Sequence, residues 1–61
     1  MKSLSEDVRS LAVEMRRVGE RMEADGRRKN KQHLIDHAAE LQNAAHTARV
    51  WVLEIEPEEK Q

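Results

Sequence analysis

Apolar residues recur along both halves of the chain at alternating intervals of four and three positions. This spacing keeps side chains on one stripe of an α-helix, as in the a and d positions of a coiled coil. The pattern therefore predicts two long helices. The first stripe is Leu4, Val8, Leu11, Met15, Val18 and Met22, and the second is Leu34, Ala38, Leu41, Ala45, Ala48, Val52 and Ile55.

The two stripes match each other when the chain is folded back near Arg28. Leu4 then lies opposite Val52, and Met22 lies opposite Leu34. At several layers a large residue of the first stripe faces an alanine of the second, which lets helix axes approach closely. The sequence therefore predicts an all-α fold, an antiparallel two-helix hairpin.

Capping residues set the expected helix ends. Ser3 is a candidate N-cap, and Glu6 completes a capping box with it. Gly26 can take the left-handed conformation that ends helices, and Asn30 can cap the next helix. Pro57 disfavours helical geometry at the residue before it. These signals predict a helix over about 4–25, a turn over 26–30, a helix over about 31–56 and a frayed acidic tail over 57–61.

A lone hairpin leaves half of each stripe in water, so the sequence also predicts self-association. Val50, Trp51, Val52 and Leu53 make the second helix apolar almost all round, which is typical of a helix buried on more than one side. The simplest assembly is a two-fold dimer that forms a four-helix bundle. The predicted interface residues are Leu4, Val8, Leu11, Met15, Val18, Met22, Leu34, Ile35, His37, Leu41, Val50, Trp51 and Leu53.

The net charge is only −1, but its placement along the predicted rod is uneven. The turn is basic, and the open end carries Glu54, Glu56, Glu58 and Glu59. Opposite charges at the two ends favour antiparallel association of hairpins. The basic turn is also a candidate phosphate site, for RNA or a cyclic nucleotide. Its candidate residues are Arg27, Arg28, Lys29, Lys31 and His33.

Catalytic and metal chemistry have little basis in this sequence. His33 and His37 lie one helical turn apart, but the chain has no cysteine and no H-E-x-x-H pattern to complete a zinc site. No phosphate-binding glycine loop or nucleophile motif is present. We therefore expect a protein that is not an enzyme, with no cofactor, metal or catalytic residues. Without a membrane-length apolar segment or a secretory signal, the expected location is the cytoplasm, with no membrane contact.

One segment of the second predicted helix resembles a known family. The run from Leu34 to Leu41, LIDHAAEL, is similar to the L-x-D-H-A-x-E-L run of the Rop family of plasmid copy-number regulators. The resemblance implies a hairpin that dimerises into an antiparallel four-helix bundle and binds paired RNA loops. Rop-type recognition uses an aromatic residue on the first helix, which this chain lacks, so no RNA-contact residues are carried over.

The chain is also similar in general character to small accessory proteins encoded by phages or plasmids. Such proteins block host machinery through protein contact or sequester a nucleotide signal. Three functions therefore stay open from the sequence. The leading one is an oligomeric helical regulator or inhibitor that binds a protein target. The alternatives are a binder of RNA or a nucleotide through the basic turn, and a purely structural oligomerisation module.

Overall fold

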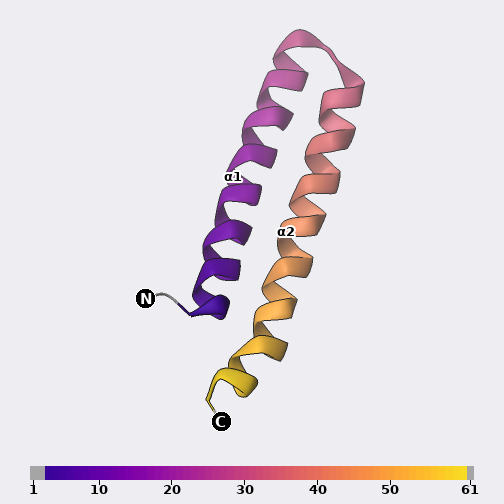
Figure 1. Cartoon of the computed structure of the whole chain (residues 1–61). Coiled ribbons are helices and arrows are strands. Elements are labelled where there is room, and N and C mark those ends of the chain that lie inside the picture. Colours follow the sequence, from indigo (N-terminus) through magenta and orange to yellow (C-terminus); the bar gives the residue numbers. More distant parts are fainter. Residues whose placement is uncertain (1–2, 61) are drawn as a thin grey trace.

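The chain forms two long helices that lie side by side and run in opposite directions (Figure 1). The computed structural model describes residues 3–60, with α1 over Leu4–Lys29 and α2 over Gln32–Glu59. Together the helices form a rod of about 50 × 19 × 9 Å. The predicted all-α antiparallel hairpin is confirmed. Within residues 3–60, neither helix provides the apolar length that a membrane-spanning segment requires.

The first helix begins where the capping pattern predicts. Ser3 has an extended backbone, and its hydroxyl accepts a hydrogen bond from the backbone N–H of Glu6 at 3.3 Å. Glu6 and Asp7 add negative charge to the first turn, where the helix dipole favours it. The N-cap prediction is therefore confirmed.

The turn lies later than predicted. Gly26 keeps a helical backbone and is buried against Leu34 and Ile35, so its small size serves packing rather than helix termination. Asn30 takes the left-handed conformation instead, with φ 55° and ψ 46°, and ends α1. The predicted turn over 26–30 and the predicted role of Asn30 as N-cap of the second helix are therefore wrong. Lys31 occupies that N-cap position and provides no side-chain cap.

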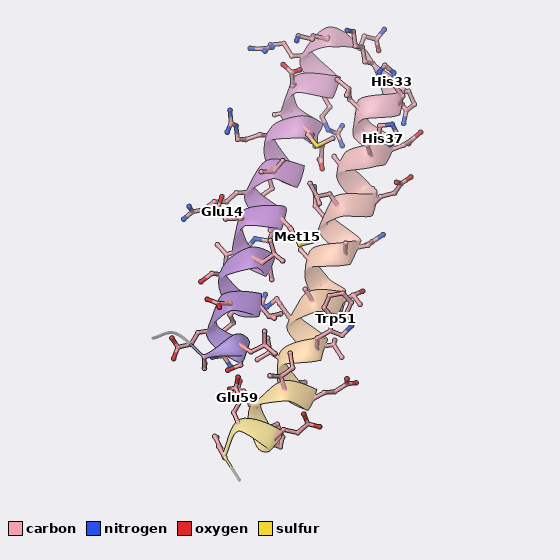
Figure 2. The ribbon with its side chains drawn as sticks, in the orientation of Figure 1. Glu14, Met15, His33, His37, Trp51 and Glu59 are labelled. Atoms are coloured by element: carbon pink, nitrogen blue, oxygen red, sulfur yellow. The ribbon has the colours of Figure 1, made fainter. Side chains whose placement is uncertain are left out.

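The second helix runs through Pro57 to Glu59, past its predicted end at residue 56. Its last turn is held by the carboxylate of Glu59, which accepts hydrogen bonds from the backbone N–H of Ser5 at 2.8 Å and from the Ser5 hydroxyl at 2.6 Å. Figure 2 shows Glu59 beside the first turn of α1. The predicted frayed tail is therefore wrong for residues 57–60, and residue 61 lies outside the described residues.

Small residues, not large ones, form the α1 side of the contact between the helices. The buried positions of α1 repeat every seven residues, and those of α2 follow the predicted stripe. The α1 set is Ser5, Ala12, Gly19 and Gly26, and the α2 set is Ala38, Ala45, Ala48 and Val52. A Cβ added at Gly19 would lie 2.8 Å from Gln42 Cγ and 3.3 Å from the Ala38 carbonyl oxygen, so the two helices approach closely at this glycine.

This packing corrects two details of the predicted pairing. Leu4, Leu11 and Val18 were expected in the contact, but each lies one residue before a buried small residue and is exposed. The pairing is also offset by about one helical turn, because Leu34 packs against Gly26, four residues after its expected partner Met22. Close approach of the small residues explains the change of face, and the later turn at Asn30 explains the offset in pairing.

Candidate functional site

One face of the hairpin carries a row of large apolar residues that the fold leaves uncovered. Leu4, Leu11 and Val18 are 61%, 55% and 42% exposed. They lie seven residues apart on α1, so they form a straight row beside the half-buried Val8, Met15 and Met22. In Figure 2, Met15 is directed toward α2, whereas Glu14 is directed away from it.

The second helix continues this apolar face. Trp51 is 50% exposed and comes one residue before buried Val52, the same relation that Leu11 has to buried Ala12. In an antiparallel pair, equivalent positions of the two helices lie on the same face. Figure 2 shows Met15 and Trp51 on the near side of the hairpin. We call this surface the stripe face: Leu4, Val8, Leu11, Met15, Val18 and Met22 of α1 with Leu34, Leu41, Ala44, Trp51 and Ile55 of α2.

A row of charges borders the stripe face along α1. Asp7, Glu14, Arg21 and Arg28 are all exposed and lie seven residues apart, so two acids are followed by two bases. Arg21 and Arg28 also line a shallow hollow of about 720 Å³ with Val18, Met22 and Leu34 at the turn end of this face. Sequence reasoning grouped charges by their place along the rod and missed this heptad row.

The basic turn has carboxylate partners for three of its four cations. Arg27 pairs with Glu23 at 3.4 Å, and Asp25 receives both Arg28 at 2.5 Å and Lys29 at 3.1 Å. Hydrogen bonds from Lys29 and Arg28 hold the pKa of Asp25 below its ordinary value. Lys31 has no such pair within residues 3–60. The phosphate site stays a prediction, on a turn where two carboxylates pair with three of the four cations and which therefore keeps a net positive charge.

Two of the three histidines of α2 lie near the turn but do not assemble a metal site. The rings of His33 and His37 pack edge to face with centroids 6.2 Å apart. His37 Nδ1 lies 3.9 Å from Glu40 Oε2, and His33 and His37 are both exposed. In the part of the chain that the structure describes, no three His, Cys, Asp or Glu side chains come together as metal ligands.

The opposite face of the hairpin has polar contacts between the helices. Arg9 forms an ion pair with Glu56, and Gln42 donates a hydrogen bond to Glu23 at 3.3 Å. A groove runs along this opposite face. Val50 and Leu53 line it, so these two predicted interface residues lie outside the stripe face. A third, Ile35, is half-buried against Gly26.

Comparison with protein-family models, with curated proteins and with solved structures finds no match to this chain.

Proposed function

We propose that this chain is a non-enzymatic helical module that works by association, and that two hairpins pair through their stripe faces into a four-helix bundle. The observation that carries the proposal is the exposed row of Leu4, Leu11 and Val18 beside the helix contact. A straight apolar row of this kind is what a coiled-coil partner covers. Covering the exposed half of each residue contributes about 1 kcal/mol apiece in each copy.

Charge selects one arrangement of the two hairpins. Two face-to-face arrangements have two-fold symmetry, one with the turns together and one with each turn beside the other copy's open end. The first brings two basic turns together, and the second brings each turn near the acidic end that carries Glu54 and Glu58. Opposite charges favour the second, in which α1 of one copy faces α1 of the other, antiparallel.

The charge row agrees with this arrangement. In an antiparallel α1 pair, acids at residues 7 and 14 of one copy meet bases at residues 28 and 21 of the other. The same alignment sets Met15 opposite Val18 and Met22 opposite Leu11 of the second copy, so its central layers are apolar. Apolar cover and charge pairing therefore support the same register.

The dimer carries the function by presenting the remaining surface to a protein target, in line with the regulator or inhibitor expected from the sequence. Two surface features of the fold support this proposal, the stripe face and the groove opposite it. Trp51, at the α2 side of the stripe face, then lies in the self-interface rather than at a target contact.

Two matched substitutions test the bundle. Leu11→Glu places a charge in the centre of the stripe face, where Leu11 is 55% exposed. Val13→Glu changes a similarly exposed residue of the same helix, 49% exposed, on the opposite face. We expect sedimentation equilibrium to give the 7.1 kDa monomer for Leu11→Glu and twice that mass for Val13→Glu. Equal masses for the two variants would contradict the proposed interface.

A further inference from the structure

A groove runs along the face of the hairpin opposite the stripe face. Its floor includes the buried Ala12 and Ala45, whose small side chains leave a valley of about 630 Å³ between the helices. Its apolar rim is exposed on both sides, with Val13 on α1 and with Val50 and Leu53 on α2. We call this surface the back groove.

The charged residues of the back groove are all basic. Arg9, Arg16 and Arg49 line it together with His46, and no carboxylate does so among residues 3–60. Arg49 makes no ion pair within those residues, and Arg16 reaches Glu20 only at 3.6 Å. Exposed ion pairs of this kind contribute little, so the guanidinium groups stay available to an external carboxylate. Arg9 is engaged by Glu56.

We propose that the back groove binds an amphipathic helix of another protein, one with acidic residues beside its apolar stripe. The valley between two antiparallel helices accommodates a third helix, whose apolar side chains would cover Val13, Val50 and Leu53. Its carboxylates would meet Arg16 and Arg49 in the fork geometry that guanidinium groups favour. The groove lining within the described chain holds no Phe, Tyr or Trp on which a nucleobase could stack, so a protein helix fits it better than a nucleic acid.

This inference rests on the proposed function only in taking protein contact as the mode of action. The back groove lies on the face opposite the proposed dimer contact, so the groove of each hairpin stays open in the bundle. A two-fold dimer would then hold two target helices, one on each outer side.

Two synthetic helical peptides of about 18 residues, or five turns, provide the probe. Both carry the same leucine stripe, flanked by glutamates in one and by lysines in the other. By fluorescence anisotropy at low salt, we expect the wild-type protein to bind the glutamate peptide at least about tenfold more tightly. The double variant Arg16→Glu, Arg49→Glu should reverse this preference.

The matched control is Arg17→Glu, Arg27→Glu, which makes the same change in net charge at exposed positions outside the groove. This variant should keep the preference for the glutamate peptide. Equal affinity for both peptides, binding of neither, or an unchanged preference in the groove variant would overturn the proposal. So would tighter binding of a thymidine oligonucleotide than of the glutamate peptide.

Sedimentation of the same samples separates the two proposals. A dimer that binds neither peptide would refute the back groove and leave the bundle standing. A monomer that binds the glutamate peptide, with reversal in the groove variant, would refute the bundle and leave the groove standing. Far-ultraviolet circular dichroism of each variant shows that the helices are intact.

Discussion

Replacing Gly19 with leucine tests which face of α1 packs against α2. A Cβ at residue 19 would lie 2.8 Å from Gln42 Cγ and 3.3 Å from the Ala38 carbonyl oxygen. The Gln42 side chain can turn away by giving up its hydrogen bond to Glu23, but the α2 backbone at Ala38 cannot. A leucine side chain at this position must therefore push the two helices apart.

Two opposing energies set the expected magnitude. Overpacking a close contact costs about 1–3 kcal/mol. Leucine in place of a mid-helix glycine gains about 1 kcal/mol through helix propensity. Because a whole isobutyl group enters a space that excludes one methyl group, we expect the upper part of the overpacking range. The net result is a loss of about 1–2 kcal/mol in the free energy of unfolding.

Urea denaturation followed by circular dichroism measures this loss, with all samples at one protein concentration because the proposed association would add to apparent stability. The control is Ala24→Leu, at an exposed position of the same helix, which should change stability by less than about 0.5 kcal/mol. A Gly19→Leu variant more stable than the wild type would refute the reasoning. That result would mean that α1 packs through Leu4, Leu11 and Val18.

Three further predictions follow from particular contacts. Glu14→Arg and Arg21→Glu should each weaken dimerisation in sedimentation, because the two residues meet across the proposed two-fold axis, and the double variant should restore dimerisation. A double variant that dimerises no better than the single variants would contradict that register. Asn30→Val should lower stability by about 1–2 kcal/mol in urea, since residue 30 has φ 55°, whereas Asn30→Gly should not; equal loss in both would argue against a left-handed cap. The hydrogen bonds from the Ser5 hydroxyl and N–H lower the pKa of Glu59. The ionised carboxylate therefore stabilises the fold fully at pH values above the ordinary glutamate pKa, and this contribution disappears as the pH falls through the lowered pKa. Thermal melts between pH 7 and pH 3 should therefore show a smaller acid-induced drop in Tm for Glu59→Gln than for the wild type, and identical drops would count against the contact.

The helices and their antiparallel arrangement could be predicted because periodicity alone decides them. The face of α1 could not be predicted in the same way, because two adjacent heptad rows compete for the contact. Leu4, Leu11 and Val18 are larger and so were expected inside. The row of Ser5, Ala12, Gly19 and Gly26 is also visible in the sequence, but its advantage depends on close approach of the two backbones, which only the pair of helices together determines.

The helix ends show the same dependence on tertiary contact. Gly26 and Asn30 can both adopt a left-handed backbone, so either could end α1. Burial of Gly26 against Ile35 decides in favour of Asn30. Likewise, Pro57 predicts the end of α2 from local geometry, whereas hydrogen bonds from Ser5 to Glu59 extend the helix beyond it. Contacts between the two helices thus changed both local predictions.

The division of the exposed apolar residues between two faces could not be predicted from the sequence pattern either. Val50, Trp51 and Leu53 are near neighbours in the chain and were assigned to one interface. In the structure Val50 and Leu53 line the back groove, whereas Trp51 lies on the stripe face. A shift of one or two residues on a helix is enough to change the face, because successive side chains are about 100° apart.

The most direct test of the account is the mass of the wild-type protein in solution over a range of concentrations. Sedimentation equilibrium at micromolar concentrations and above should give twice the 7.1 kDa chain mass, with dissociation promoted by high salt through the charge row. A stable 7.1 kDa species throughout that range would show that the stripe face needs no second copy, and would contradict the central claim.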